Sequence, residues 1–337
     1  MKALKILIVM LVLIMSVGAV CAADNMADDA MGDDSKGILK TVQEDITTDD
    51  STDILKTTQN DIYTASEDSF TNLTDEIKSK DVVDLTHDYK FNNETDDSRG
   101  IVIGKDNFVL NGNDHTIDGN DQARLLYITG TNITLNDLIL INGNYPNCAG
   151  ICAIGTALTL NNVTFINNHG DDQGGAIGIR DGTTLICNNS RFIDNYAKDG
   201  PSILVADKES ELKLYNSYIT SKTFAKASQV FLTSSSWVIT QAYIENTTFA
   251  NITSSYAPAI YGKGIKVSII RSKFINLKAN ITAGAIGARE GGELYIENCE
   301  FENVTSSKNG GAIFADVSGS EDSTGNVTII GTKFKDT

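Results

Sequence analysis

A short phrase recurs along this chain at intervals in the twenties, and this regularity constrains the fold more than any other feature. The phrase reads Gly-Gly-Ala-Ile at residues 174–177 and 310–313 and Gly-Ala-Ile at 284–286, with looser copies at 149–151 and 258–260. An aromatic residue follows each copy: Phe165, Phe192, Phe274, Phe301 and Phe334. Self-similarity at such a period predicts a solenoid whose repeats stack on one another.

Alternating residues lead up to each aromatic residue. Leu158-Thr159-Leu160 precedes Phe165, and Leu294-Tyr295-Ile296 precedes Phe301. Apolar residues at every second position indicate strands with one buried face. A leucine-rich repeat shares the period but needs a further segment with its own leucine spacing, which is missing here. The sequence therefore predicts an all-β chain, a right-handed parallel β-helix of the pectin-lyase-like class with about nine coils. Their anchors are spaced 23 to 33 residues apart: Ile117, Leu140, Phe165, Phe192, Ile219, Phe249, Phe274, Phe301 and Phe334.

Stacked repeats bring like residues together, which gives several expectations. Phe, Leu and Ile are expected to form ladders inside, with Asn at the corners, because Asn tolerates left-handed backbone. Cys187 falls at an inward position and is expected to be a buried free thiol. Cys148 and Cys152 share one loop and can pair in an oxidising exterior, and without a second Cys or His pair they do not indicate zinc. The three prolines are expected in loops: Pro146, Pro201 and Pro258.

A longer regularity suggests that a four-coil block was duplicated. Leu140 and Phe249 are 109 residues apart, as are Phe165 and Phe274. Arg180-Asp181 likewise matches Arg289-Glu290 at the same offset. The two Arg–acid pairs would lie about 19 Å apart along the rod. We therefore expect a repeated structural or surface position rather than one catalytic site.

The N-terminal region reads as three successive segments. Residues 1–23 have the lysines, apolar run and small residues of a secretory signal peptide, and no later segment is apolar enough to span a membrane. Residues 24–68 are an acidic, low-complexity spacer. The β-helix is expected at 69–337, with a capping helix near 70–80 over its first coil, because an open end of stacked strands invites association. No cap follows the last coil, so we expect a piece of a longer protein.

Charge and glycosylation sequences bear on possible partners. The chain carries 44 acidic and 27 basic side chains, which argues against a nucleic-acid partner. Sequons are expected to carry sugar only where the asparagine is exposed. Ten occur: Asn72, Asn93, Asn132, Asn162, Asn188, Asn246, Asn251, Asn280, Asn303 and Asn326.

Two stretches carry a family resemblance. Residues 111–120, Asn-Gly-Asn-Asp-His-Thr-Ile-Asp-Gly-Asn, together with the strand at Asp84-Leu85-Thr86, resemble the opening of archaeal adhesin-like surface proteins of methanogens. The Gly-Gly-Ala-Ile phrase with Phe-x-Asn, as at Phe165-Ile166-Asn167, is similar to the repeats of chlamydial polymorphic outer-membrane proteins. The resemblance covers about residues 70–337 and implies a parallel β-helix displayed at the cell surface. It names no ligand.

An enzyme must be weighed against a binding surface, because the same fold class hosts polysaccharide lyases and glycosidases. The best acidic candidate is Asp171 and Asp172 in the sequence His169-Gly170-Asp171-Asp172, and these read as solvated turn residues. The histidines His87, His115 and His169 are widely separated, so no triad or metal cluster is visible. Tyrosines suit sugar rings, and eight are candidates for an exposed face: Tyr145, Tyr196, Tyr215, Tyr218, Tyr243, Tyr256, Tyr261 and Tyr295.

We therefore expect a secreted or cell-surface adhesin-like protein whose non-catalytic surface binds glycans or the surface proteins of other cells. The sequence assigns no catalytic, cofactor-binding or metal-binding residue. Two alternatives stay open at this point. One is a carbohydrate-active enzyme on the same fold, and the other is a structural component of the cell envelope.

Overall fold

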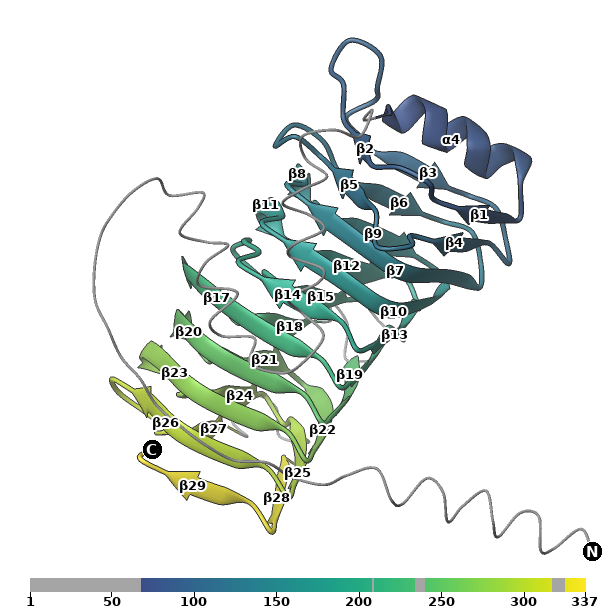
Figure 1. Cartoon of the computed structure of the whole chain (residues 1–337). Coiled ribbons are helices and arrows are strands. Elements are labelled where there is room, and N and C mark those ends of the chain that lie inside the picture. The colour runs from purple at the N-terminus through teal and green to yellow at the C-terminus, as the bar shows by residue number, and fades with distance from the viewer. Residues whose placement is uncertain (1–67, 208, 234–239, 317–324) are drawn as a thin grey trace, which may run out of the picture. The chain divides into compact units, whose positions relative to one another are not determined.

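A computed structural model describes residues 68–207, 209–233, 240–316 and 325–337. The predicted signal peptide and the predicted spacer up to residue 67 lie outside the described residues. The described part forms a parallel β-solenoid of about eight turns with one short helix at its N-terminal end (Figure 1). Each pairing between its strands is parallel. The predicted fold is thus confirmed, and the right-handed sense of the coil stays a prediction.

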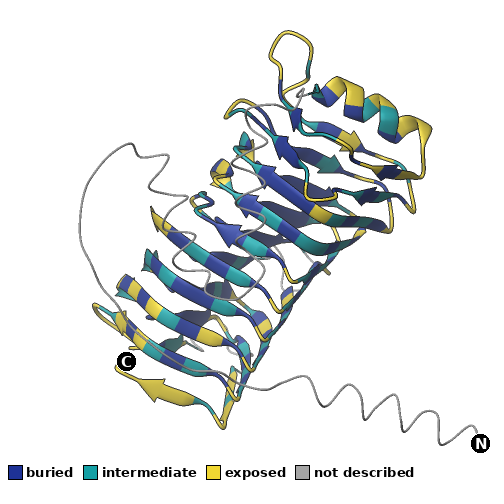
Figure 2. Cartoon of the chain, in the orientation of Figure 1, coloured by how far each residue is buried: buried dark blue, intermediate teal, exposed yellow. Residues whose placement is uncertain are grey.

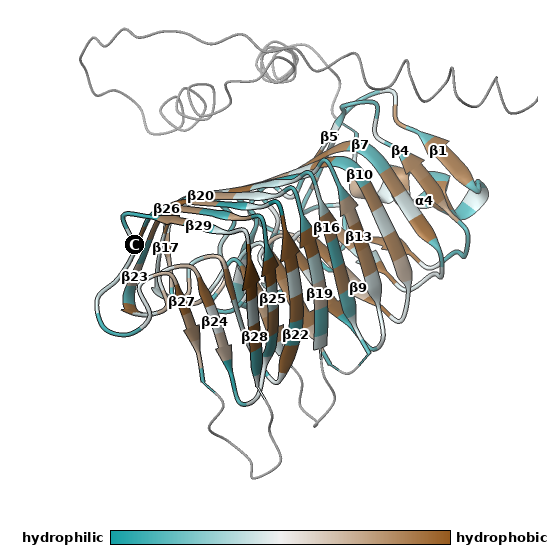
Figure 3. Cartoon of the chain, turned by 90° about the horizontal axis from the view of Figure 1, so that it is seen from below, coloured by the Kyte–Doolittle hydropathy of each residue, from teal (hydrophilic) through white to brown (hydrophobic). Residues whose placement is uncertain are grey.

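Each turn contributes strands to three faces, called here the first, second and third legs. The first leg comprises β1 (Val82–Asp84), β4 (Val109–Asn111), β7 (Ile133–Ile141), β10 (Ala157–Ile166), β13 (Thr184–Asn188), β16 (Glu211–Tyr215), β19 (Thr240–Glu245), β22 (Ile265–Ile270), β25 (Glu293–Glu297) and β28 (Asn326–Ile330). Seen from below, these strands lie side by side in coil order (Figure 3).

The second leg begins after a corner. It comprises β2 (Tyr89–Lys90), β5 (Thr116–Asp118), the second halves of β7 and β10, β14 (Arg191–Ile193), β17 (Tyr218–Ala225), β20 (Thr248–Tyr256), β23 (Lys273–Thr282), β26 (Glu300–Ser306) and β29 (Lys333–Lys335). Since β7 and β10 run through the corner, the first two legs form one 18-stranded sheet.

The third leg is a separate sheet of nine strands. About eight turns of the solenoid lead from its first strand to its last. It comprises β3 (Ile101–Ile103), β6 (Leu126–Ile128), β9 (Ile151–Ile154), β12 (Ile177–Arg180), β15 (Ile203–Ala206), β18 (Val230–Thr233), β21 (Ile260–Lys263), β24 (Ile286–Arg289) and β27 (Ile313–Ala315). A small two-stranded sheet pairs β8 (Asn144–Asn147) with β11 (His169–Gln173). Along the chain, each of these strands comes just before a strand of the third leg.

The register confirms the predicted anchors. Successive anchors from Ile117 to Phe334 are paired directly with one another through all nine positions. One earlier member, Tyr89, pairs with Ile117 and was missed because it is a tyrosine in a strand of only two residues, β2. The rings of Phe249, Phe274 and Phe301 stack nearly parallel, with centroid distances of 5.2 and 4.5 Å. Cys187 lies in the same core, fully buried as predicted.

Asparagine occupies the corners as expected. Asn162, Asn216 and Asn246 have positive φ at the corner between the first and second legs. On the outer face just before this corner, the amide of Asn161 donates to Asn136 and that of Asn188 to Asn161, both at 2.8 Å. Amide donors and acceptors therefore satisfy one another along the rod. The ten sequon asparagines all lie at exposed or half-buried positions.

A column of buried hydroxyl and thiol groups follows that corner. The Oγ of Ser272 accepts a hydrogen bond from the Thr247 N–H of the preceding coil at 3.2 Å and donates to the Ile270 carbonyl at 3.0 Å. Cys299 repeats the arrangement one coil on, with its Sγ accepting from the Ser272 N–H. The column satisfies backbone groups that the bend removes from the sheet. Its members are Ser190, Ser217, Thr247, Ser272, Cys299 and Thr332.

The Gly-Gly-Ala-Ile phrase marks the turn into the third leg. Gly174 has a φ of +65°, in the left-handed region that favours glycine. Gly175 lies against the next coil, where an added Cβ would come within 2.3 Å of the Pro201 carbonyl oxygen. The first glycine therefore supplies the bend and the second the close approach.

The predicted cap is present as α4 (Phe70–Ser79). The Oγ of Ser69 accepts a hydrogen bond from the Asn72 N–H and caps the helix N-terminus. Its apolar face, Phe70, Leu73 and Ile77, is buried over the first coil. At the other end of the described solenoid, β28 and β29 are coloured as exposed (Figure 2). Ladder residues are accordingly uncovered there, with Phe334 45 % exposed.

One expectation about proline was wrong. Pro146 lies within β8 rather than in a loop, whereas Pro201 and Pro258 lie between strands as expected. β8 pairs only with β11, and the register shifts between Gly170 and Gln173, opposite this part of β8. Proline is tolerated here because an edge strand leaves one side of its backbone unpaired.

Replacing Phe274 by alanine tests the aromatic stack. The ring is fully buried between Phe249 and Phe301, so we expect the variant to lose about 3–5 kcal/mol in the free energy of unfolding. Urea unfolding followed by circular dichroism measures the change. Phe334→Ala is the matched control, because Phe334 ends the same stack with its ring largely uncovered, and it should cost far less. Equal losses in the two variants would contradict this account.

Replacing Ser272 by alanine tests the hydroxyl column. The change leaves the Thr247 N–H without its partner in a buried corner, and we expect a loss of about 1–3 kcal/mol in the free energy of unfolding. Ser268→Ala, on the outer face of β22 just before this corner, should stay within about 0.5 kcal/mol of the parent. Thermal and urea unfolding give both values. A Ser272→Ala variant as stable as the Ser268→Ala variant would show that the column does not carry stability.

Candidate binding surface

The prediction that the acidic candidates lie in a turn was wrong, because they lie in a strand that pairs with β8 on one side and is bridged to Tyr196 and Asp199 on the other. His169, Asp171 and Asp172 belong to β11, with side chains 47, 65 and 57 % exposed. Asp172 forms an ion pair with Lys198 of the next coil. His169 Nε2 is 3.9 Å from Asp171 Oδ1. A glycosidase acid needs a sheltered pocket that keeps it protonated, and these carboxylates are open to solvent.

The repeated Arg–acid sequences have a structural role. Arg180 lies 3.8 Å from Asp207 of the next coil, and Arg289 lies 3.8 Å from Asp316 of its next coil. Both arginines end equivalent strands, β12 and β24, four coils apart. Each guanidinium therefore ties two coils together, as the duplication predicts.

The three histidines stay apart in the structure. His87 approaches Asp68 at 3.3 Å, and His115 approaches Asp88 at 3.2 Å. His169 lies on a later coil beside Tyr196. In the described part of the chain, no three or more His, Cys, Asp and Glu side chains gather in a way that could hold a metal ion.

The eight candidate tyrosines are spread over several faces. Tyr145 packs under the guanidinium of Arg124, with 3.9 Å between ring centroid and Cζ. Tyr261 stacks on Phe231 on the outer side of the third leg. Three others, Tyr215, Tyr243 and Tyr295, share the outer side of the first leg. Only these three combine a common face with nearby carboxylates, while Tyr196, Tyr218 and Tyr256 lie elsewhere.

We call this outer side the tyrosine face and define it by Tyr215, Tyr243, Glu245, Tyr295 and Glu297. The strands place these residues outward because their neighbours in sequence, such as Ile244 and Ile296, point into the core. All five are half-buried. They thus present ring and carboxylate surface on rigid strands rather than on loops.

The sequence Tyr-x-Glu occurs twice on the tyrosine face. Tyr243 Oη donates to Glu245 Oε2 at 2.8 Å, and Tyr295 Oη donates to Glu297 Oε2 at 2.8 Å. The two pairs lie two coils apart, which is about 10 Å. Ser268, the residue between the tyrosines in register, is small. Tyr215 pairs in register with Glu245 rather than with Tyr243, and its ring centroid lies 5.7 Å from that of Tyr243.

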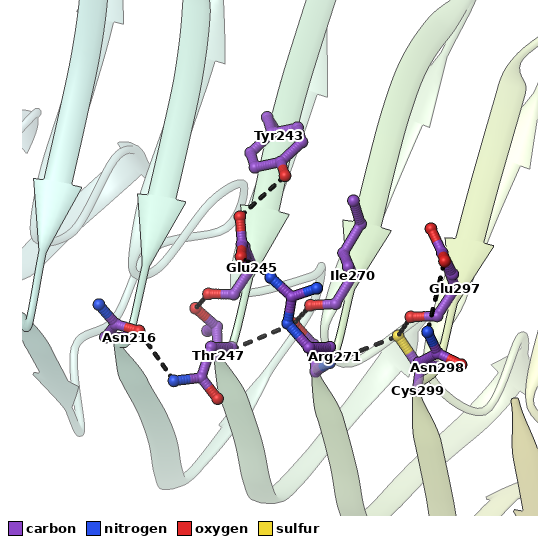
Figure 4. Close-up of polar contacts among 11 residues, drawn as sticks. Asn216, Tyr243, Glu245, Thr247, Ile270, Arg271, Glu297, Asn298 and Cys299 are labelled. Carbon is purple, nitrogen blue, oxygen red and sulfur yellow. Dashed lines mark hydrogen bonds and ion pairs between the residues drawn. The ribbon is translucent and has the colours of Figure 1, made fainter. Parts of the chain in front are cut away.

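One charged residue interrupts the asparagine corner beside this face (Figure 4). Arg271 has a φ of +49° at a position held by Asn246 in the preceding coil and Asn298 in the next. Its guanidinium reaches back to Glu245. Left-handed backbone at a residue with a side chain costs about 1–2 kcal/mol. At Arg271 this conformation places a cation against the Tyr243–Glu245 pair. Such local strain is often found at functional positions.

The two carboxylates hold the tyrosines in their neutral form. The hydrogen bond to Glu245 raises the pKa of Tyr243, and the hydrogen bond to Glu297 raises that of Tyr295. Both hydroxyls therefore remain protonated throughout the physiological range. The second oxygen of each carboxylate also has a partner, Arg271 at Glu245 and the Asn298 amide at Glu297, so a further donor would use the remaining lone pairs.

A cavity lies near the cap, where α4 meets the third leg. Its volume is about 730 Å³, and its walls include Phe70, Lys78, Arg99, Val102 and Tyr127. Lys78 pairs with Asp75 and Arg99 with Asp97, while Arg124, which also lines the cavity, donates to the main-chain carbonyls of Asn147 and Cys148. It is open and carries no converging set of polar groups of the kind that orients a ligand.

Sequence reasoning named the three tyrosines of the face but did not single them out. The Tyr-x-Glu spacing was visible in the sequence and would have distinguished Tyr243 and Tyr295 from the rest. Arg271 was also missed, although it replaces asparagine at a corner position. No described helix has the length and apolarity to cross a membrane.

Replacing Glu297 by glutamine tests the Tyr–Glu pair. Loss of the carboxylate should lower the pKa of Tyr295 toward the ordinary tyrosine value of about 10. In the parent, the raised pKa of Tyr295 stabilises the fold below pH about 10, and this contribution is lost as the pH rises through the folded-state pKa of Tyr295. NMR titration of the tyrosine rings measures the midpoint. Glu293→Gln on the same strand should leave it unchanged, and an unchanged midpoint in Glu297→Gln would contradict the pairing.

Comparison of the chain with protein families, with curated proteins and with solved structures found no match in any of the three.

Proposed function

We propose that this chain is a secreted or cell-surface adhesin-like protein that binds extended glycans, without catalysis, along the tyrosine face. The single observation that carries the proposal is the repeated Tyr–Glu pair of Tyr243–Glu245 and Tyr295–Glu297 on one strand face. A secretory signal in the sequence supports export, and the adhesin-like resemblance supports display outside the cell. The acidic composition argues against nucleic acid as a partner.

The chemistry of the tyrosine face suits a sugar polymer. An aromatic ring offers an apolar surface to the C–H face of a pyranose, and its hydroxyl keeps one end polar. Carboxylates accept strong hydrogen bonds, here from sugar hydroxyls. The two pairs repeat at about 10 Å, close to the length of a disaccharide unit in an extended chain. A linear glycan lying along the rod would thus meet equivalent groups at regular intervals.

A carbohydrate-active enzyme is the weaker alternative. Catalysis needs an acid and a base on either side of one glycosidic bond. Asp171 and Asp172 are instead exposed, and Asp172 is paired with Lys198. On the tyrosine face, each carboxylate is hydrogen-bonded to a tyrosine whose pKa it raises. A purely structural role in the cell envelope is the third alternative, and it predicts no glycan binding.

An array of plant and microbial polysaccharides tests the proposal. The purified chain is incubated with added Ca²⁺, and retained protein and released reducing or unsaturated ends are read together. We expect retention without product. The double variant Tyr243→Ala/Tyr295→Ala should bind about tenfold to a hundredfold more weakly, because each central aromatic anchor contributes about 1 kcal/mol or more. Tyr256→Ala, an exposed tyrosine elsewhere, is the matched control and should bind as the parent does.

The other outcomes point to the alternatives. Product release that disappears in Asp171→Asn or Asp172→Asn would establish an enzyme. Binding that the double variant retains would move the site away from the tyrosine face. Neither binding nor product would favour the structural role or a protein partner.

A further inference from the structure

Two cysteines lie together outside the apolar core. Cys152 is on the outer side of β9, because its neighbours Ile151 and Ala153 point inward. Gly178 pairs with Cys152 on the adjacent strand, and an added Cβ on Gly178 would come within 2.2 Å of the Cys148 sulfur. Cys148 therefore reaches over Gly178 to the neighbourhood of Cys152. The two side chains are free thiols in the structure, 1 % and 6 % exposed.

The other two described cysteines have structural positions. Cys187 lies in the inward ladder between Leu160 and Leu214. Cys299 takes the place of a serine in the hydroxyl column. Both belong to the continuous core, unlike Cys148 and Cys152.

The duplicated block shows that the fold does not need these two thiols. At an offset of 109 residues, Ala257 corresponds to Cys148 and Tyr261 to Cys152. Gly287 corresponds to Gly178, and an added Cβ there would meet Tyr261 at 2.7 Å and Ala257 at 3.2 Å. The same glycine notch is thus filled by ordinary side chains in the second copy. Cys148 has a φ of +57°, a left-handed conformation that glycine takes at position 174.

Two arginines stand beside the thiol pair. Arg124 is buried and donates from Nε to the Cys148 carbonyl at 3.0 Å. Arg180 follows Gly178 by two residues on β12 and so lies on the same side of the strand. The hydrogen bond from the Cys148 thiol, together with the charges of Arg124 and Arg180, lowers the pKa of Cys152 to about 7 against the effect of burial. The pKa of Cys148 is raised by the same hydrogen bond and by burial.

We propose that Cys148 and Cys152 form a thiol–disulfide exchange site that reacts with small-molecule disulfides, with Cys152 as the attacking thiolate and Cys148 as the resolving thiol. The assignment rests on the shared notch over Gly178, the flanking arginines and the absence of a structural need for either sulfur. It is independent of glycan binding.

The reaction balances in two steps. The Cys152 thiolate attacks one sulfur of the small disulfide, forming a mixed disulfide and releasing one thiolate. Cys148 then loses its proton to solvent and attacks the Cys152 sulfur, releasing the second thiolate. The protein dithiol is oxidised by two electrons, and the small disulfide is reduced to two thiols.

Oxidised glutathione is the probe that tests the site. The purified chain is treated with it, alkylated and mapped by peptide mass. We expect the peptide that holds both cysteines to lose two hydrogens and resist alkylation, while Cys187 and Cys299 remain reduced. Cys148→Ala, which copies the second repeat and should fold normally, should keep a stable glutathione adduct on Cys152. Cys152→Ser should take no adduct.

Other results would overturn the proposal. The proposal is wrong if both thiols of the parent can still be alkylated after treatment with oxidised glutathione. It is also wrong if the Cys152→Ser variant forms an adduct on Cys148 as fast as the parent reacts.

The arginine dependence gives a second readout with an internal control. Arg180→Gln should slow alkylation of Cys152 at pH 7 about two- to fivefold, because a higher pKa leaves less thiolate. Arg289→Gln alters the equivalent arginine of the second copy, far from both thiols, and should leave the rate unchanged. Equal rates in the two variants would contradict the part assigned to Arg180.

Discussion

Parallel pairing between successive coils is the constraint on which the whole structure depends. Because the pairing is in register, each residue lies about 4.8 Å from its counterpart in the next coil. Every column must therefore consist of side chains that tolerate their own kind as neighbours. Phenylalanine does so by stacking its rings, asparagine by linking amide to amide, and serine by bonding the backbone of the preceding coil. Each residue type consequently has its own place around the turn.

The fold could be predicted because these columns leave a visible period. Every anchor from Ile117 to Phe334 was placed correctly, since each coil carries a large apolar residue at this position and six of the nine are phenylalanine. The hydroxyl column was not found, because Ser, Thr and Cys in one position look like ordinary polar variation until the register is known. Pro146 was misplaced because nothing in the sequence announces an edge strand. The tyrosines were named but not sorted, since the coils differ in length and outward positions align only through the pairing.

The duplicated block separates what the fold requires from what it permits. Arg180 and Arg289 make equivalent ion pairs, and the ladder positions of the two copies are equally buried. Inside, corresponding residues such as Leu140 and Phe249 differ but stay apolar, whereas on the outer side Cys152 corresponds to Tyr261 and Cys148 to Ala257. The interior is fixed by stacking, so new chemistry can be added only at outward positions. The thiol pair and the tyrosine face are both of this kind.

The tyrosine face presents its side chains on neighbouring rigid strands, an arrangement that suits the polymeric ligand proposed above. Side chains on strands of a packed sheet lose little conformational freedom on binding, so little of the interaction energy is spent on ordering them. Each Tyr–Glu pair contributes only modestly by itself. A chain-like ligand of the proposed kind would engage both pairs at once, and the second contact would then be made at a high effective concentration. Affinity on the tyrosine face should therefore rise with the length of the glycan until the ligand spans both pairs.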